Sequence, residues 1–183
     1  VVYGSELLYC KLRIKERVDS YLIKEMFSGR VVKLVSLEKP LEYEFETRGL
    51  VFRAPHPKKS VEEFVSKGLS LDILGKYDLY YYLTAGTFHA IEHVIIEGSP
   101  MITGGGSCEV GGVSMGDSGF IFVYDAIPGG SGISKIIYDR FDEVVERSIR
   151  ILKECSCKRF DGCPKCTYSY QCGNNNKPLF KYG

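Results

Sequence analysis

The sequence predicts an α+β fold, in which an antiparallel β-sheet region is followed by a mixed α/β region with a long helix and a cysteine-rich C-terminal end. Three observations lead to this prediction. Apolar and polar residues alternate near the start, apolar residues recur at helical spacing over residues 133–152, and five of the seven cysteines fall within residues 155–172. The 183 residues, 44% of them apolar, suffice for one domain of ordinary size.

Residues 7–54 have the pattern of antiparallel strands. Leu8, Cys10, Leu12 and Ile14 alternate with polar residues, as in a sheet with one buried face. Short apolar segments bounded by turns follow at residues 21–23, 31–37, 43–45 and 50–52. We therefore expect this part of the chain to form a half-buried sheet of several short strands.

The segment Ala54-Pro-His-Pro57 ends this pattern, and residues 61–67 have the spacing of one short helix. We expect a β-rich segment, residues 1–57, packed on a second unit, residues 58–183, the two together forming one compact body. The chain opens with Val1 rather than methionine, so we expect it to be a fragment of a longer protein.

The aromatic run of residues 77–82, Tyr-Asp-Leu-Tyr-Tyr-Tyr, has two interpretations. Aromatic rings stack on unpaired bases in proteins that bind single strands. Tyrosines in such a run more often lie in a strand or in the core, and we favour this second interpretation.

Residues 88–96 are predicted to be helical and contain His89-Ala-Ile-Glu92-His93, a match to the H-x-x-E-H pattern of inverted zinc proteases. At 100° per residue, the two histidines and Glu92 fall on one face of the helix. Such an enzyme also needs a third metal ligand, which the sequence does not identify. We therefore favour a buried polar cluster of these three residues and Asp125, with a zinc-dependent hydrolase as the alternative.

Residues 101–119 are rich in glycine and are predicted to form a loop or a set of tight turns. A short apolar strand is expected at residues 120–124. Pro128-Gly-Gly-Ser-Gly132 then leads into a helix of about 20 residues, whose apolar positions are Ile133, Ile137, Phe141, Val144 and Leu152. A strand, a glycine turn and a helix start could cradle phosphate, but neither G-x-x-x-x-G-K-[ST] nor G-x-G-x-x-G is present.

The cysteine-rich segment has the spacing of a zinc site. Cys163-Pro-Lys-Cys166 follows a glycine and forms a C-x-x-C knuckle, which directs two thiolates at one ion. The remaining two ligands come from Cys155, Cys157 and Cys172. We favour Cys155 and Cys157, with Cys172 replacing Cys155 as the alternative. Disulfides and a redox pair fit less well, because the cysteines number seven and cluster in a turn-rich tail without a signal peptide.

Charge is unevenly distributed along the chain. From Arg147 to the end, 8 Lys and Arg stand against 2 Asp and Glu, whereas the whole chain has a net charge of +1. A basic tail around a metal knuckle is a modest indication of nucleic acid binding, and a solvated helix and loop is an equally good interpretation. The candidate contacts are Arg147, Arg150, Lys158, Arg159 and Lys165. No apolar run reaches the ~20 residues of a membrane span, so we expect no membrane association and a cytoplasmic location.

Several of these segments, in this order, resemble one family. They are His89-Ala-Ile-Glu92-His93, Glu109-Val-Gly111-Gly112-Val-Ser114, Phe122-Val-Tyr124-Asp125 with Pro128–Gly132, Cys155-x-Cys157, Gly162-Cys163-Pro-x-Cys166 and Cys172-Gly-Asn-x-Asn176-x-Pro-Leu179. From about Ala85 to Leu179 the chain resembles the zinc-binding C-terminal domain of MrfA-type superfamily 2 DNA helicases, formerly a domain of unknown function. Glu109 stands where the family pattern has Asp.

This resemblance implies a structural zinc ion and a role in DNA repair. The motor domains would belong to an upstream part of the same protein or to a partner chain. The leading hypothesis is an accessory domain, not an enzyme on its own, that helps a helicase to hold DNA or to dock its motor domains, with weak DNA binding by itself.

Overall fold

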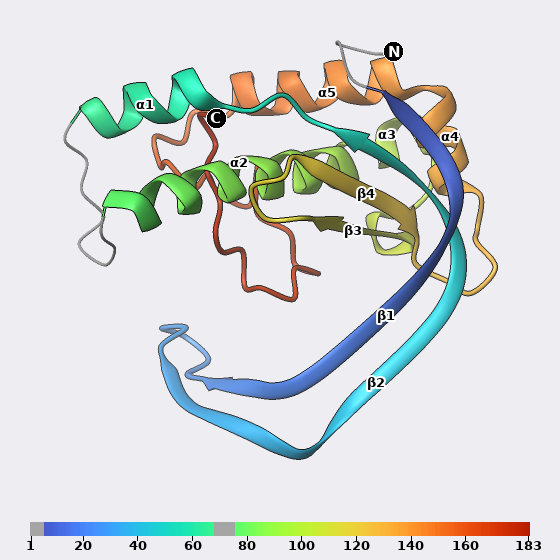
Figure 1. Cartoon of the computed structure of the whole chain (residues 1–183), viewed down its shortest axis with the longest axis horizontal. Coiled ribbons are helices and arrows are strands. Elements are labelled where there is room, and N and C mark those ends of the chain that lie inside the picture. The colour runs from blue at the N-terminus through green and yellow to red at the C-terminus, as the bar shows by residue number, and fades with distance from the viewer. Residues whose placement is uncertain (1–5, 68–75) are drawn as a thin grey trace.

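The structure, a computed structural model, describes residues 6–67 and 76–183 (Figure 1). The expectation about the chain start at Val1 lies outside these residues. The elements are β1 (Leu7–Lys24), β2 (Val31–Arg53), α1 (Lys58–Ser66), α2 (Lys76–Gly98), α3 (Pro100–Thr103), a 3₁₀ turn (Ser107–Glu109), β3 (Val110–Ser114), β4 (Phe120–Asp125), α4 (Ile133–Asp139) and α5 (Phe141–Glu154). The predicted α+β class is confirmed, as are a helix close to residues 61–67 and the strand at 120–124.

The sheet has the strand order β1-β2-β4-β3, and all of its pairs are antiparallel. β1 and β2 pair from Leu7 opposite Phe52 to Lys24 opposite Val31, whereas only the last five residues of β2, from Gly49, also pair with β4. The prediction of several short strands was therefore wrong, because two long strands replace them. The pairing is interrupted where Asp19 faces residues 37–40. Pro40 lies in this interruption, where its missing N–H breaks no ladder.

Residues 15–44 form a projecting two-stranded ribbon, which we call the arm (Figure 1). Every residue from Lys15 to Leu34 is exposed, so the prediction of a half-buried sheet was wrong for this part. At the turn, Met26 and Phe27 are 87% and 97% exposed. The arm curves beneath the body of the molecule, and near its tip Lys24 Nζ donates to Asn175 Oδ1 at 2.5 Å.

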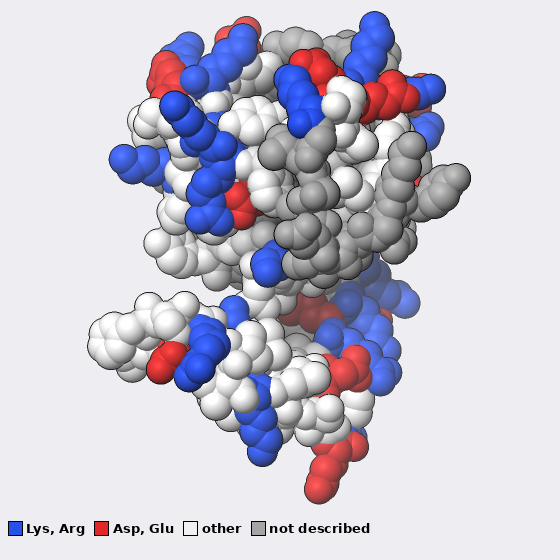
Figure 2. All heavy atoms as spheres, turned by 90° about the vertical axis from the view of Figure 1, so that its left-hand side faces the viewer, with Lys and Arg blue, Asp and Glu red and all other residues white. Residues whose placement is uncertain are grey.

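Charged side chains of opposite sign face each other across the arm and its base. Five exposed ion pairs join β1 to β2, namely Lys11–Glu46, Arg13–Glu44, Arg13–Glu46, Lys15–Glu42 and Arg17–Glu42. The side view in Figure 2 accordingly shows Lys and Arg interspersed with Asp and Glu on the arm. Such exposed pairs stabilise little individually, so they add only modestly to the cross-strand pairing.

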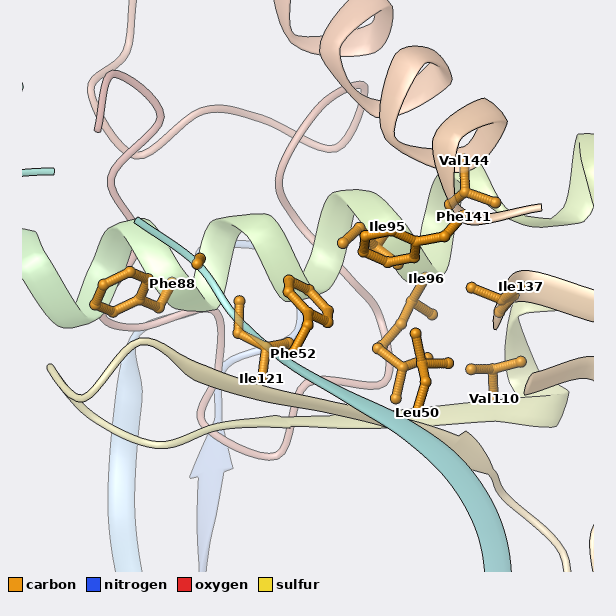
Figure 3. Close-up of a cluster of buried hydrophobic side chains, with 12 residues drawn as sticks. Leu50, Phe52, Phe88, Ile95, Ile96, Val110, Ile121, Ile137, Phe141 and Val144 are labelled. Atoms are coloured by element: carbon orange, nitrogen blue, oxygen red, sulfur yellow. The ribbon is translucent and has the colours of Figure 1, made fainter. Parts of the chain in front are cut away.

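The main core lies between the base of the sheet and the helices (Figure 3). α2 occupies the centre and contributes Phe88, Ile95 and Ile96. The sheet contributes Leu50, Phe52, Val110, Ile121 and Val123, and the helices on the other side contribute Ile137, Phe141 and Val144. The alternation of Leu8, Cys10, Leu12 and Ile14 gave the wrong buried face at the start of β1: Leu8 is 58% exposed and Cys10 is exposed, whereas Leu7 and Tyr9 pack against this core.

A second core cluster joins the first helices to the end of the chain. It contains Val61 of α1, Leu79 and Leu83 of α2, and Phe180. The Phe180 N–H donates to the carbonyl of Gly86 at 3.0 Å. A Cβ at Gly86 would lie 3.0 Å from the Phe180 nitrogen, so the glycine permits this close approach. The C-terminal segment therefore completes the helical layer.

The predicted helix of about 20 residues is interrupted at Arg140. This residue leaves the helical conformation, with φ −117° and ψ 32°, and separates α4 from α5. Its guanidinium donates to the carbonyl of Ile102 at 2.9 Å. Asp142 and Glu143 follow in the first turn of α5, where negative charge favours a new helix start. The apolar spacing predicted both helices but not the break, because Ile137 and Phe141 face one core.

The glycine-rich region is also more regular than expected. Gly111 and Gly112 lie in β3 rather than in a loop, and α3 precedes it. Among the described residues, no helix is both long enough and apolar enough to cross a bilayer.

Candidate metal centre and adjoining polar cluster

Four cysteines converge beyond the end of α5. The Sγ atoms of Cys155, Cys157, Cys163 and Cys166 all lie within 4.8 Å of one another. The pair distances are 3.6 Å for Cys155–Cys163, 3.7 Å for Cys157–Cys166 and 3.8 Å for Cys163–Cys166. Thiolates bound to one tetrahedral zinc at about 2.3 Å are about 3.8 Å apart. The spacing therefore fits zinc, and it is too wide for disulfide bonds.

The local sequence explains this convergence. The residue before the knuckle, Gly162, has φ +87°, and a Cβ there would collide with the Thr167 side chain. The Cys163 carbonyl accepts hydrogen bonds from the N–H groups of Cys166 and Thr167, at 2.9 and 3.1 Å, which closes the turn. The Lys165 N–H donates to Cys163 Sγ at 3.4 Å. The predicted tight knuckle is therefore present.

The surroundings of the four cysteines shift their thiol pKa values in both directions. A backbone hydrogen bond from Cys157 lowers the pKa of Cys155 to about 7, although desolvation opposes the shift. Burial raises the pKa of Cys166 to about 12. Four thiolates this close would repel one another strongly in the absence of a cation. Lys181 Nζ lies 3.5 Å from Cys157 Sγ and supplies a positive charge that no sequence signal pointed to.

The fifth clustered cysteine is not part of this group. Cys172 lies with His89 and His93 of α2, and its Sγ is 3.4 Å from His89 Nε2. The alternative in which Cys172 replaces Cys155 therefore has no geometric support. Spacing along the chain could not distinguish the two arrangements, because the partners of Cys172 are about 80 residues away.

Glu92, the third residue of the H-x-x-E-H motif, has different neighbours. Burial raises the pKa of its carboxyl group, a shift that nearby His89 and Ser114 of β3 partly offset. A Cβ at Gly112 would lie 2.7 Å from Glu92 Cγ, so this glycine lets β3 contact the carboxylate side chain directly. Glu92 does not belong to the group formed by the two histidines and Cys172.

Asp125 belongs to a separate site. Its carboxylate accepts hydrogen bonds from the Gly132 N–H at 3.0 Å, the Ser134 N–H at 2.7 Å and the Ser131 hydroxyl at 3.2 Å. These groups begin α4, and Asp125 is 1% exposed. The glycine turn is therefore filled by the protein's own carboxylate at this point. The predicted cluster of His89, Glu92, His93 and Asp125 is thus divided among three sets of partners.

The candidate nucleic-acid residues differ in their availability. Arg150, Lys158 and Lys165 are exposed. Arg159 is already bound to Asp161 through two hydrogen bonds, at 3.0 and 2.8 Å. Arg147 is half-buried, and its Nε is buried without a hydrogen-bond partner among the described residues. The aromatic run lies in the first turns of α2, with Tyr81 54% exposed, and the side chain of Tyr77 lies outside the described residues.

Comparison with known proteins decides the family. Residues 91–167 match the description of the MrfA Zn-binding domain. An uncharacterized protein of Methanocaldococcus jannaschii is 40% identical over 102 residues, which are 51% of this chain and 89% of that protein. The chain belongs to the MrfA Zn-binding domain family. Zinc is therefore its cofactor, and the four-cysteine group fits the ion.

Two helicases are similar in sequence to parts of this MrfA Zn-binding domain. The uncharacterized ATP-dependent helicase YprA of Bacillus subtilis is 39% identical over 46 residues, 25% of this chain. The ATP-dependent helicase HRQ1 of Saccharomyces cerevisiae is 35% identical over 65 residues, 34% of this chain. The match covers 6% of each helicase.

The fold of the domain is also found in a solved helicase structure. It matches the crystal structure of the DUF1998 helicase MrfA bound to DNA, with a TM-score of 0.54 and 20% identity over 92% of this chain and 20% of that chain. The sequence matches to the two helicases confirm the predicted relationship of the MrfA Zn-binding domain to ATP-dependent helicases.

Proposed function

We propose that this chain acts as an accessory zinc-binding domain of an ATP-dependent DNA helicase, where it helps to hold nucleic acid or to dock the motor domains. The observation that carries this proposal is the fold match to MrfA bound to DNA, which extends over 92% of the chain. The sequence itself contains no phosphate-binding motif of a nucleotide hydrolase. The domain is accordingly not an enzyme by itself, and ATP is hydrolysed by other domains or by a partner.

We propose further that Cys155, Cys157, Cys163 and Cys166 hold the zinc ion. Their mutual spacing and the hydrogen-bonded knuckle support this assignment. A closed set of four thiolates leaves no position for a substrate, so the ion's contribution is to folding. It ties the end of α5 to the segment that returns to α1 and α2.

The hydrolase alternative receives little support from the position of Glu92. A metal-dependent hydrolase needs a carboxylate that can take a proton from metal-bound water. The Glu92 side chain instead lies against Gly112 of β3. We therefore propose no hydrolytic chemistry here.

The DNA-binding part of the proposal is tested by salt-dependent binding of the zinc-loaded chain to a fluorescent oligonucleotide. Arg150, Lys158 and Lys165 are changed together to glutamate, because these three candidates are exposed. Each lost phosphate contact lowers the slope of log K against log salt by about 0.7 to 0.9. We expect weaker binding at low salt and a slope reduced by about 2.

The matched control carries three charge reversals on other exposed lysines, Lys33, Lys39 and Lys59. It has the same net charge as the first variant, so it separates local contacts from the overall field of the protein. Equal binding by wild type and the first variant would reject the assigned contacts. An equal loss in both variants would show that net charge alone drives binding.

A further inference from the structure

Cys172 and the two histidines form a second convergent group of ligand atoms. His89 and His93 lie one turn apart on α2, and each offers a ring nitrogen within 4.8 Å of the other and of Cys172 Sγ. The rings are 4.3 Å apart between centroids. His89 and His93 are 7% and 2% exposed, whereas Cys172 is partly exposed, so the two rings are largely shielded from water.

Hydrogen bonds fix which nitrogen of each histidine faces Cys172. His89 Nδ1 lies 2.7 Å from the carbonyl of Pro178, and His93 Nδ1 lies 2.7 Å from the carbonyl of Thr167. A carbonyl oxygen only accepts, so both Nδ1 atoms carry the proton. In the neutral rings, each Nε2 therefore has a free lone pair. Histidines that bind metals are oriented in this way, with the other nitrogen donating to a carbonyl or a carboxylate.

A thiol alone does not satisfy both rings. Cys172 has one S–H proton, which can be donated to one Nε2 lone pair at a time, so the second ring keeps an unmatched acceptor. Removing the thiol proton to a histidine would instead leave a charged pair in a buried place, which is costly. One cation satisfies both nitrogens and the sulfur together. A distance of 3.4 Å from His89 Nε2 to Cys172 Sγ is close to the ~3.6 Å expected between N and S ligands of one tetrahedral zinc.

The loop that carries Cys172 is firmly constructed. Asn175 and Asn176 have φ of 54° and 59°, which turns the chain tightly. The Asn176 side chain accepts from the Ser169 N–H at 2.8 Å and donates to the Ser169 carbonyl at 3.0 Å. The Asn176 N–H donates to Cys172 Sγ at 3.3 Å, as the Lys165 N–H does to Cys163 Sγ in the first centre. The sulfur is thus oriented in the same way as a thiolate in a zinc knuckle.

We propose that His89, His93 and Cys172 form a second zinc site, distinct from the four-cysteine centre. Two nitrogens and one thiolate are a donor set that zinc prefers over magnesium or calcium. The ion joins α2 to residues 172–178, so it fastens the C-terminal segment at a second point. This site does not depend on DNA binding and goes beyond the proposed function.

The test measures zinc content and zinc X-ray absorption of the full chain. Wild type is expected to contain about two zinc ions per chain, with nitrogen scatterers from imidazole beside sulfur. Cys172→Ser and His93→Gln are each expected to lose about one zinc ion and to leave an all-sulfur shell. Cys108→Ser is the matched control, since this exposed cysteine belongs to neither group, and it should keep both ions.

If a variant does not fold, the X-ray absorption spectrum and zinc content of the wild type still decide the test. One zinc ion per chain with an all-sulfur shell in wild type would overturn the proposal. Two zinc ions in Cys172→Ser with an unchanged nitrogen signal would overturn it as well. Loss of the imidazole signal in His93→Gln, with the sulfur shell intact, would support it.

Discussion

Asp125 is the residue whose side chain holds the most local structure together outside the cysteine groups. Its carboxylate accepts hydrogen bonds from three donors at the start of α4. The Thr47 hydroxyl of β2 also donates a hydrogen bond to the backbone carbonyl of Asp125, at 2.8 Å, and so connects the same residue to β2. Because Asp125 is buried, no solvent water could accept these hydrogen bonds in place of its carboxylate. The glycine turn therefore depends on a single charged side chain.

We predict that Asp125→Ala lowers the free energy of unfolding by about 2 to 4 kcal/mol, because hydrogen bonds to a charged group are lost and buried N–H groups stay unpaired. Urea denaturation followed by circular dichroism measures this change. The control is Asp117→Ala, an exposed carboxylate in the turn before β4, which should cost less than about 0.5 kcal/mol. Equal denaturation midpoints for the two variants would show that Asp125 does not stabilise α4.

The role of a single residue could be predicted from the sequence only where the chemistry of the side chain and its spacing from neighbouring residues both pointed to that role. Cys163 and Cys166 could be assigned to one ion because a glycine and a proline force the turn between them. The position of Cys172 could not be predicted, since it depends on where α2 lies in the fold. Similarly, helical periodicity correctly placed Glu92 on the same helix face as the histidines. It could not predict that Gly112 allows β3 to pack against the Glu92 side chain.

Among the elements, the arm has the least contact with the rest of the molecule. Its strands continue the sheet, but their side chains from Lys15 to Leu34 are exposed on both faces. The core begins only at the base, where Leu50 and Phe52 are buried. The arm therefore contributes little to the core.

We predict that the body folds and keeps its metal when residues 15–44 are replaced by Asn-Gly. Ile14 and Phe45 already face each other, so a two-residue hairpin turn can join them. The free energy of unfolding should change by less than about 1 kcal/mol, because mostly exposed surface is removed. Urea denaturation and zinc analysis measure the two outcomes.

A base-of-sheet variant calibrates this experiment. Leu50→Ala removes a side chain that is 0% exposed and should cost about 2 to 5 kcal/mol in the same assay. If excision of the arm destabilises the protein as much as Leu50→Ala does, the arm is part of the folding unit.

Element types could be predicted from the sequence better than element lengths. The strand pattern of residues 8–14 and the helical spacing of residues 133–152 both gave the correct type. The lengths of the strands and helices depended on features that leave no pattern in the local sequence. The ribbon continues through polar residues because cross-strand pairing and ion pairs suffice without a buried face, and the helix breaks at Arg140, whose non-helical dihedral angles no local sequence pattern predicts.

In the whole molecule, the C-terminal segment joins parts that are distant in sequence. The segment after the knuckle returns to α2, where Phe180 enters the second core cluster and Leu179 is 1% exposed. Because the zinc-binding turn immediately precedes this return, metal binding and helix packing are expected to be coupled.

We predict that zinc removal loosens both regions together. The Cys166 N–H bonds to the Cys163 carbonyl and the Phe180 N–H bonds to the Gly86 carbonyl, so their hydrogen exchange reports on the knuckle and on the helical layer. Both amides should lose protection on treatment with a chelator, because zinc binding energy is folding energy. Cys163→Ser tests the four-cysteine centre by itself and should expose the same two amides. A Phe180 amide that stays protected in this variant would mean that the two regions are independent.

The overall architecture was predictable in part. The α+β class follows from the strand and helix patterns, and the zinc site follows from cysteine density. The return of residues 178–180 to α1 and α2 was not predictable, because Leu179 and Phe180 are two apolar residues in a polar tail without periodicity. Tertiary contacts alone make them core residues.

This return also orders events in time. Val61 and Leu83 emerge from a ribosome well before Phe180, and at 5–20 residues per second the last partner arrives roughly 5 to 24 s later. During that interval the apolar faces of α1 and α2 have no covering segment, and the histidines of α2 wait for Cys172. A nascent chain is therefore open to chaperones, to stray metal ions and to aggregation for seconds, until residues 172–180 have been made.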